Sequence, residues 1–404
     1  MGLRSLIRKT SLYKKYQAKR EAQMNDEEYF IYRHKKIFGY TPNFRNPQTF
    51  NEKIIHRILF DRNPIYTALA DKLKARIYIA EKLKDFHVKN TLDSKHVVVR
   101  SHVTTSFHSN ATNHNNDNCN SMNVGGGGEQ PGSLEQDNSN YKDTKELHLK
   151  QNVGSIESKW NNQIPLLNQD SSLFQPIDTL TQELFNTNSC PYLPKLYGIY
   201  KSIDEIDFTK LPQSFVLKTN HDSGGVVLVK DKELFLSDSK SFNEAMTKLT
   251  THLNTNFYTM YREWHYKDIE PRIFAEEMLF TTGLNGESKV PEDYKIHCFG
   301  KFQYIQVDTD RFVEHTRSLF DADWNLMPFS ICYPQSATPP NKPHNFNAMI
   351  AIAIKLSMSF KMLRVDLYNI EGKIIVGELT FTHGGGTEHF TPSEWDKKLG
   401  DLWQ

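Results

Sequence analysis

The sequence is poor in the features that mark membrane-spanning, zinc-binding and nucleic-acid-binding proteins. It has no run of about 18 apolar residues, so we expect no membrane-spanning helix. Its net charge is +1, so no global field attracts nucleic acid, and we expect no such partner. The four cysteines, Cys119, Cys190, Cys298 and Cys332, lack the spacing of a zinc site. We interpret them as free thiols of a cytoplasmic protein.

Several common catalytic patterns are missing as well. No Gly-Lys-Ser/Thr opens a helix as in a P-loop, and no Rossmann fingerprint is present. The sequence also lacks a Gly-x-Ser-x-Gly or catalytic cysteine pattern. Nothing in the sequence therefore points to a protein nucleophile.

The most informative feature that is present is a pair of apolar segments near the C-terminus. Residues 363–368 and 374–380 flank a turn at Gly372 and fit a β-hairpin, with Asp366 on one strand and Glu378 on the other. Facing carboxylates can share Mg²⁺, because this cation prefers oxygen ligands and keeps sites for water and phosphate. The hairpin predicts a surface that binds a metal ion and a nucleotide. A sheet edge with solvated acids is the alternative interpretation.

A second pair of apolar segments lies upstream. Residues 215–218 and 226–229 are typical of short strands, and the loop between them contains a Ser-Gly-Gly sequence. Glycines let backbone N–H groups approach phosphate oxygens closely, and Lys218 at the end of the first strand supplies a positive charge. The pattern predicts a phosphate-binding loop, with a simple turn as the alternative.

Two further segments complete the order of elements. Residues 272–279 fit an apolar strand that runs into two acids, and residues 292–307 fit two strands around a Gly-Lys turn. The whole order resembles that of the ATP-grasp superfamily, and more closely its teichuronopeptide-biosynthesis (TupA-like) branch. The closer resemblance rests on residues 46–53, 61–64, 69–72, 217–221, 262–264, 306–312 and 394–400.

The resemblance implies an α+β protein with the ATP-grasp fold, in which two α+β subdomains clasp ATP. It also implies ATP and Mg²⁺ as cofactors, and it assigns roles to individual residues. Lys72 and Lys218 would contact the ATP phosphates, Ser223, Gly224 and Gly225 would cover them, and Glu276, Glu277 and Leu279 would hold adenine and ribose. Asp366 and Glu378 would bind Mg²⁺, with Arg364 and Lys295 near the γ-phosphate.

The sequence departs from the superfamily pattern at one position of the metal site. The superfamily commonly has asparagine two residues after the metal-binding glutamate, where this sequence has Thr380. A hydroxyl can still ligate a metal or its water, so Thr380 stays in the expected metal set, and one or two metal ions remain open. The following His-Gly-Gly-Gly sequence, residues 383–386, either shapes the carboxylate site or forms a flexible turn.

Composition marks off the insertion and the basic arm, and the resemblance implies the two subdomains that follow, so four parts are expected. Residues 86–190 form an Asn/Ser-rich insertion whose low apolar content predicts disorder, with His108 and His114 solvated. The other parts are a basic arm with a helical region over 1–85, a small ATP-grasp subdomain over 191–285 and a large subdomain with the metal site over 286–404. Helical apolar spacing is found over residues 25–38 and 50–83, and a further helix is expected over 243–257.

The resemblance implies a ligase. ATP-grasp enzymes typically phosphorylate a carboxylate to an acyl phosphate, which an amine then attacks to give an amide. The implied acceptor is a carboxylate-bearing saccharide or lipid-linked glycan of cell-surface polysaccharide biosynthesis, and the implied amine donor is an amino acid or an amino sugar. An ATP-dependent glycan kinase and a non-catalytic binding module are the other interpretations of the same scaffold.

A glycosyltransferase is a rival class. Asp308 and Asp310, and likewise Asp321 and Asp323, match the acid-x-acid pattern of metal-dependent enzymes that use nucleotide sugars. That class has no use for the lysine strand, the glycine loop and the later carboxylate pair together. Separately, residues 1–20 hold seven Lys/Arg and no acid, so this arm can contact an anionic membrane at its inner face, or form a solvated helix packed on the domain.

Overall fold

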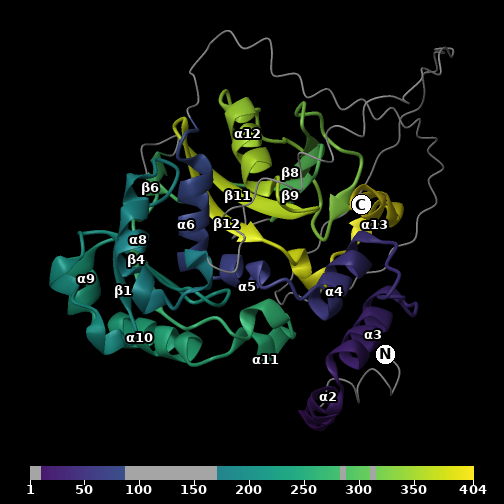
Figure 1. Ribbon diagram of the computed structural model, residues 1–404, viewed down its shortest axis with the longest axis horizontal. Coiled ribbons are helices and arrows are strands. Elements are labelled where there is room, and N and C mark those ends of the chain that lie inside the picture. The colour runs from purple at the N-terminus through teal and green to yellow at the C-terminus, as the bar shows by residue number, and fades with distance from the viewer. Residues whose placement is uncertain (1–10, 87–170, 283–287, 310–314) are drawn as a thin grey trace, which may run out of the picture. The chain divides into compact units, whose positions relative to one another are not determined.

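A computed structural model describes residues 11–86, 171–282, 288–309 and 315–404, and Figure 1 shows how their sheets and helices are arranged. The first half of the basic arm, the insertion up to residue 170 and Asp310 lie outside the described residues, as do Cys119, His108 and His114. In the described part of the chain, every helix is too short or too polar to span a membrane.

A five-stranded antiparallel sheet has the strand order β12-β11-β7-β8-β9. Its strands are β7 (Asp293–Phe299), β8 (Phe302–Thr309), β9 (Thr316–Asp321), β11 (Leu363–Ile370) and β12 (Lys373–Thr380). The predicted C-terminal hairpin is confirmed as β11 and β12, and the register places Asp366 opposite Glu378. The predicted hairpin over 292–307 is confirmed as β7 and β8.

Alternation along these strands gives the five-stranded sheet two unlike faces, because successive side chains point to opposite sides. On β7, Tyr294, Ile296 and Cys298 face an apolar core. The alternate residues Asp293, Lys295 and His297 face the other side. The register carries this division across the sheet. The polar face carries Tyr368, Asp366 and Arg364 of β11, Glu378 and Thr380 of β12, Asp293, Lys295 and His297 of β7, Gln306 and Asp308 of β8, and Arg317 of β9.

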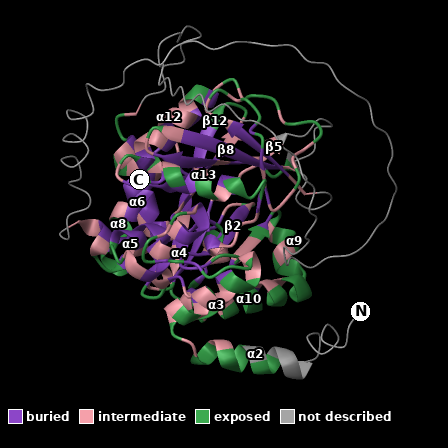
Figure 2. Ribbon diagram, turned by 90° about the vertical axis from the view of Figure 1, so that its right-hand side faces the viewer, coloured by how far each residue is buried: buried purple, intermediate pink, exposed green. Residues whose placement is uncertain are grey.

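The apolar face is covered by two helices. Helix α12 (Phe346–Ser357) contacts β11 and β7, and helix α6 (Lys72–Leu83) contacts α12 and β12. Met349, Ile352 and Leu356 of α12 are fully buried in this core together with Leu363 and Val365 of β11. Figure 2 shows the strands as the buried centre and the outer helices as partly exposed.

A second, four-stranded antiparallel sheet has the order β1-β4-β2-β3. Its strands are β1 (Leu196–Tyr200), β2 (Phe215–Thr219), β3 (Val226–Val229) and β4 (Ile273–Glu276). The predicted lysine strand, loop and following strand are confirmed as β2 and β3. Helix α10 (Ser239–Leu253) packs on this sheet through Met246 and Leu249.

Helix α10 differs from the helix expected over 243–257. It begins four residues earlier because Asp238 caps its first turn, accepting hydrogen bonds from the backbone N–H groups of Lys240 and Ser241. It ends at Leu253, and Phe257 begins the separate helix α11 (Phe257–Tyr261), which Asn256 caps.

The N-terminal region consists of α2 (Ser11–Gln23), α3 (Asp26–Phe38), α4 (Phe50–Phe60), α5 (Ile65–Ala70) and α6. The helical spacing over 50–83 therefore corresponds to three helices. They separate at Asn63-Pro64 and at Asp71, which caps α6 by accepting from the backbone N–H of Leu73. Capping boxes at Asn25 and Thr49 fix the starts of α3 and α4.

Helix α4 is tied to segments at the far end of the sequence. The buried Arg57 donates to the carbonyls of Met362 and Phe381, at 3.0 and 2.9 Å, and stacks 4.3 Å from the ring centre of Trp403. Lys53 Nζ donates to the carbonyl of Gly400 at 2.8 Å. These contacts join α4 to α13 (Glu394–Leu402) and to the end of β12.

The insertion expected over 86–190 ends earlier than its composition suggested. Residues 171–190 contain short helical turns and α8 (Thr181–Asn186), and four apolar side chains of this stretch are buried. They are Leu173, Ile177, Leu180 and Leu184. The remaining described α-helix and strands are α9 (Lys232–Ser237), β5 (Thr281–Thr282), β6 (Ser288–Lys289), β10 (Ser330–Ile331) and β13 (Phe390–Thr391). The subdomain boundaries within 191–404 stay a prediction.

Candidate active site

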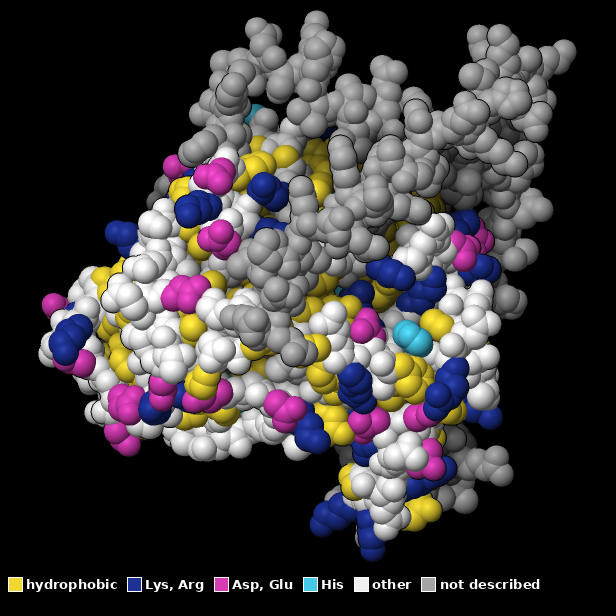
Figure 3. Space-filling model, viewed as in Figure 1, with side chains coloured by type: hydrophobic (Ala, Val, Ile, Leu, Met, Phe, Trp, Pro, Cys, Tyr) yellow, Lys and Arg dark blue, Asp and Glu magenta, His cyan; other side chains and the backbone are white. Residues whose placement is uncertain are grey.

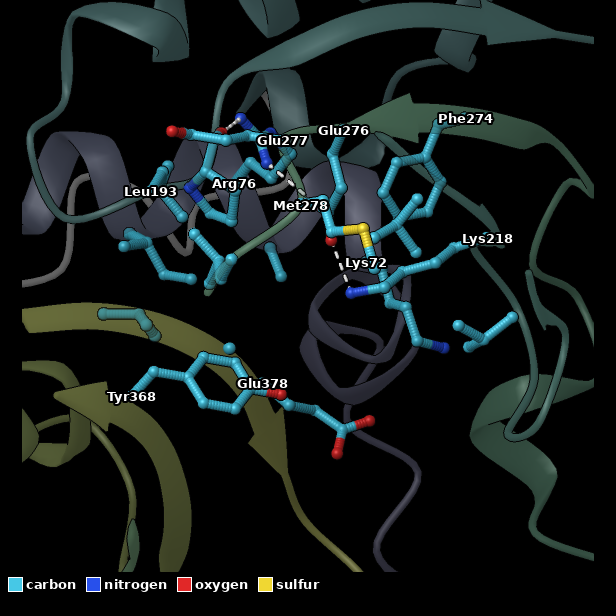
Figure 4. Close-up of a pocket in the computed structure, with 18 of the residues that line it drawn as sticks. Lys72, Arg76, Leu193, Lys218, Phe274, Glu276, Glu277, Met278, Tyr368 and Glu378 are labelled. Atoms are coloured by element: carbon cyan, nitrogen blue, oxygen red, sulfur yellow. Dashed lines mark hydrogen bonds and ion pairs between the residues drawn. The ribbon is translucent and has the colours of Figure 1, made fainter. Parts of the chain in front are cut away.

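A cavity of about 260 Å³ lies between the two sheets and helix α6 (Figure 4). One side is formed by β2, β3 and β4, the opposite side by β11 and β12, and the third by α5 and α6. The apolar part of its lining includes Val216, Phe274, Met278, Leu279, Val376 and Leu379. A slot of this kind can hold a flat heteroaromatic ring, because apolar side chains line it from both sheets.

The charged part of the cavity brings together residues from three distant segments. Lys72 begins α6, Lys218 lies on β2 and Glu378 lies on β12, and all three side chains line the cavity. In Figure 4 the two amino groups and the Glu378 carboxylate enter the same part of the cavity. Two cations facing a carboxylate across a cavity suit a ligand that carries phosphates and a divalent cation.

Glu276 at the end of β4 is buried between two cations. Its carboxylate forms an ion pair with Lys218 Nζ, and its second oxygen lies 3.4 Å from Arg76 Nη1. Glu276 thus lines the cavity, as do Glu277 and Leu279, but one of its oxygens holds Lys218 in place and the other pairs with Arg76. Arg76 was not expected, although it lies four residues after Lys72 and therefore on the same face of α6.

The loop after β2 is joined to the start of α6. The backbone N–H of Lys72 donates to the carbonyl of Asn220 at 3.0 Å, and Lys72 Nζ donates to the carbonyl of Asp222. Asn220 Nδ2 in turn donates to Asp71 at 2.9 Å. Burial lowers the pKa of Lys72, with Glu378 and Asp222 acting in the opposite direction. Lys72 is therefore a partly buried residue of the site and not an exposed helix lysine.

The Ser-Gly-Gly tip of this loop lies outside the lining of the cavity. Ser223 and Gly224 are exposed, whereas Gly225 is buried. A Cβ atom at Gly225 would fall 1.8 Å from Thr219 Oγ1, so only glycine fits there. The Asp222 carboxylate accepts hydrogen bonds from Thr219 and His252 and so fixes the loop on α10.

The predicted metal residues form a dense charged cluster on the polar face of the five-stranded sheet. Arg364 contacts both oxygens of Asp366, at 2.6 and 2.8 Å, and its Nη2 atom also lies 3.4 Å from Glu378 Oε2. Lys295 Nζ lies 3.1 Å from Asp366. Burial raises the pKa of Asp366, but Arg364 and Lys295 outweigh it and bring the pKa below its ordinary value. Asp366 is therefore a carboxylate at neutral pH.

The donor set fits Mg²⁺. All of its donors are oxygens, and oxygens of Asp366 and Glu378 flank Nη2 of Arg364, while Thr380 Oγ1 lies 3.3 Å from Glu378 Oε2. Within the described residues no group of three His, Cys, Asp or Glu side chains is placed to hold a metal by itself. The remaining ligands would come from water and phosphate, as is usual for Mg²⁺.

The acid-x-acid segments of the rival interpretation are used in other ways. Asp308 Oδ1 lies 2.7 Å from Arg317 Nε. Burial raises the pKa of Asp308, but Arg317 outweighs it and lowers the pKa to about 2. Asp321 accepts the backbone N–H groups of Asp323 and Asn325, at 2.9 and 2.8 Å, and so caps a turn. Asp310 lies outside the described residues.

Two sheets that enclose a cavity with paired lysines on one side and Glu378 on the other, next to the Arg364–Asp366 pair, define an ATP-grasp protein. More specifically, the family model for TupA-like ATP-grasp proteins matches residues 189–404, and the chain belongs to this family. Lys72 and Arg76 lie outside the matched segment. A comparison with curated proteins finds no match.

Solved structures of ATP-grasp ligases are also similar to this chain. An L-amino acid ligase from Bacillus licheniformis is 16% identical, with a TM-score of 0.31, over 55% of this chain and 49% of that one. A D-alanine–D-alanine ligase from Bacillus anthracis complexed with ATP is 15% identical, with a TM-score of 0.27, over 51% and 53%. The enzyme of the same name from Helicobacter pylori is 13% identical, with a TM-score of 0.29, over 55% and 56%. The chain spans about half the length of these proteins.

Proposed function

We propose that the protein is an ATP- and Mg²⁺-dependent carboxylate–amine ligase that works through an acyl phosphate. The observation that carries this proposal is the arrangement of Lys72 and Lys218 opposite Glu378 at one end of an apolar slot, with Arg364 joining Glu378 to Asp366 behind it. The slot suits adenine, and the charged end suits the phosphates. Membership in the TupA-like ATP-grasp family supports the same reading.

In this proposal the protein acts mainly by positioning and by charge. Lys218, held by Glu276, and Lys72, held by the loop after β2, face the phosphates. Arg364 is fixed by Asp366 and by the buried His383, whose Nδ1 lies 2.6 Å from Arg364 Nη1. Burial brings the pKa of His383 well below its ordinary value, so the ring is neutral and accepts this hydrogen bond. Bound Mg²⁺ would neutralise phosphate charge.

The two chemical steps balance without a protein nucleophile. A carboxylate oxygen attacks the γ-phosphorus, and ADP leaves with the electron pair of the broken P–O bond. The amine nitrogen then attacks the acyl carbon, the C–N bond forms, and phosphate leaves. Of the two protons that an ammonium group loses in becoming an amide N–H, one leaves with hydrogenphosphate and the other passes to a base.

The substrates follow from the family resemblance. The proposed acceptor is a carboxylate-bearing saccharide or lipid-linked glycan of cell-surface polysaccharide biosynthesis, and the proposed donor is an amino acid or an amino sugar. Lys and Arg side chains gather over α2 and α3 (Figure 3), among them the exposed Lys15, Lys19, Arg20, Lys35 and Lys36. This basic surface supports peripheral contact with an anionic membrane on the cytoplasmic side.

The decisive experiment measures what the purified protein binds and what it releases. Calorimetry with Mg²⁺ and ATP, and separately with UDP-sugars, identifies the nucleotide. Nucleotide chromatography then follows ADP and phosphate in the presence of uronic acids, amino acids and glucosamine. ADP release that requires both a carboxylate and an amine supports the ligase. A phosphorylated glycan hydroxyl indicates a kinase, and UDP-sugar binding without ATP binding overturns the proposal.

A variant of Lys218 tests the phosphate site directly. Lys218→Met removes the charge that faces the cavity, so we expect ATP affinity to fall roughly 10- to 100-fold. Calorimetry measures the affinity, and thermal melting checks that the variant is folded. The matched control is Lys240→Met, because Lys240 is exposed on α10. Equal affinity in both variants would remove Lys218 from the site.

A further inference from the structure

The segment that links α11 to β4 brings a buried carboxylate to the end of β12. Glu263 is 8% exposed, and its Oε2 atom accepts a hydrogen bond from Thr382 Oγ1. Thr382 lies four residues after Glu378, just beyond the end of β12. Glu263 does not line the cavity, so it is not part of the nucleotide pocket, but it interacts electrostatically with Glu378.

The second oxygen of Glu263 is not engaged. Among the described residues no donor makes a hydrogen bond to Oε1. A Cβ atom placed on Gly385 would lie 3.8 Å from Oε1 and 3.8 Å from Arg33 Nη1, with no closer neighbour. Gly385 has φ +57° and lies in a run of three glycines with positive φ, a conformation that suits glycine. The absence of a side chain at Gly385 thus leaves space for a group of about the size of a methyl or an ammonium group in van der Waals contact with Oε1.

No cation of the described chain neutralises Glu263 at contact distance. His265 Nε2 lies 3.8 Å away, but burial, assisted by Arg57 and Arg62, lowers the pKa of His265 to about 3, so the ring is neutral. Burial also raises the pKa of Glu263 to about 7. The hydrogen bond from Thr382 and the charge of Arg33 lower this pKa, whereas the charge of Glu378 raises it. A carboxylate buried in this way is stabilised when a cation arrives.

We propose that Glu263 binds the ammonium group of the amine substrate, in the space between its Oε1 atom and Gly385 and beside the Glu378 carboxylate. This inference rests on the proposed ligase function. Several groups surround the site, namely Thr382, His265, Arg33, Glu378 and Tyr266. An ammonium group has three donors, so it can bond to the free carboxylate oxygen and leave its nitrogen turned toward the acyl phosphate.

The same carboxylate can take the proton that the amine must lose. When the ammonium gives one proton to Glu263, its nitrogen gains the lone pair that forms the C–N bond, and the C–O bond to phosphate breaks. The second proton leaves with hydrogenphosphate, and Glu263 returns its proton to solvent. The site therefore selects a basic amine, an amino acid or an amino sugar, over an uncharged nucleophile.

Hydroxylamine separates this role from the first chemical step. It is largely uncharged near neutral pH and converts an acyl phosphate to a hydroxamate, so it reports phosphorylation of the carboxylate without an ammonium group. The test compares hydroxamate formation from ATP and a uronic acid with amide formation from the same acid and glycine, L-lysine or D-glucosamine. The variants are Glu263→Gln and the matched control Glu244→Gln, an exposed residue of α10.

We expect Glu263→Gln to lower amide formation about 100-fold, with a raised KM for the amine, while hydroxamate formation falls less than about threefold. Glu244→Gln should change neither rate. Thr382→Val, which removes the hydrogen bond that orients Glu263, should give a smaller loss in amide formation. Equal losses of both products in Glu263→Gln, or no loss of either, overturn the amine site. Absence of hydroxamate with wild-type protein overturns the ligase itself.

Discussion

The two faces of the five-stranded sheet are built from the same strands, but one packs in the apolar core and the other carries a charged cluster. On β11, Leu363, Val365 and Leu367 are fully buried against α12 and α6. The residues between them, Arg364 and Asp366, belong to the charged cluster on the opposite face. Neighbouring residues of the same strand therefore serve different purposes, packing in the core or forming the charged cluster. A shift of the strand by one residue would exchange the apolar and the charged residues between the two faces.

The largest expected effect is on the charged face. Glu378→Gln keeps the shape of the side chain but removes the charge that would hold Mg²⁺, so we expect ATP turnover to fall by about 10³-fold or more. Stability should change little, because the Glu378 side chain is 41% exposed and lies 3.4 Å from Arg364. Phosphate release and thermal melting measure the two properties, with Glu244→Gln as the control. Retained ATP turnover in Glu378→Gln would show that the charged face does not carry the catalytic site.

The apolar face should give the opposite result. Leu363→Ala leaves a cavity beside α12 at a position with no exposed surface, so we expect the free energy of unfolding to fall by about 2–5 kcal/mol. Turnover of the folded enzyme should stay within about threefold of wild type. Urea unfolding measures the loss, and Leu234→Ala, at a side chain that is 67% exposed, should cost under about 0.5 kcal/mol. A loss of turnover without a loss of stability would contradict the comparison.

The smallest effect concerns an ion pair at the far side of the charged face. The pKa of Asp308 is about 2, against an ordinary value of 3.8, so its ionisation stabilises the fold at pH values above 3.8 and this contribution is lost as pH falls through 2. Asp308→Asn should therefore cost about 2 kcal/mol at neutral pH, because the lowered pKa of Asp308 favours its charged form in the folded protein. The difference from wild type should shrink between about pH 4 and pH 2.

Urea unfolding at several pH values measures this difference. Asp323→Asn is the control, because Asp323 is exposed. A difference that stays constant with pH would mean that the Asp308–Arg317 pair contributes through packing and not through charge.

Local sequence patterns were enough to predict most strands and one important contact. Alternation in residues 363–380 predicts the hairpin with Asp366 and Glu378 facing each other, as the register confirms. Counting from the turn alone would pair Asp366 with Gly377, and a β-bulge between Asp366 and Leu367 shifts the pairing by one residue. The strand with Lys218 and its partner are equally local features. Helix ends were less predictable, because the start of α10 depends on the cap at Asp238, not on apolar spacing.

Contacts between distant segments could not be predicted in the same way. Nothing near Arg76 in the sequence indicates that this residue of α6 contacts Glu276, which lies 200 residues away at the end of β4. Glycines mark the loop after β2, but they do not say where its tip points, and Ser223 and Gly224 lie outside the cavity lining. Glu263 gives no local signal of its contact with Thr382. These features depend on how the sheets and helices pack, which single-sequence patterns do not encode.

The clamp between α4 and the C-terminal segment also governs when the chain can fold. Arg57 bonds to carbonyls 305 and 324 residues further along, and Lys53 bonds to one 347 residues away. The ribosome synthesises α4 long before it synthesises these partners. The apolar and cationic surface of α4 therefore stays without its native contacts in the nascent protein. Contacts of such high sequence separation slow folding. Helix α4 therefore completes its native packing only after residue 400 has been synthesised.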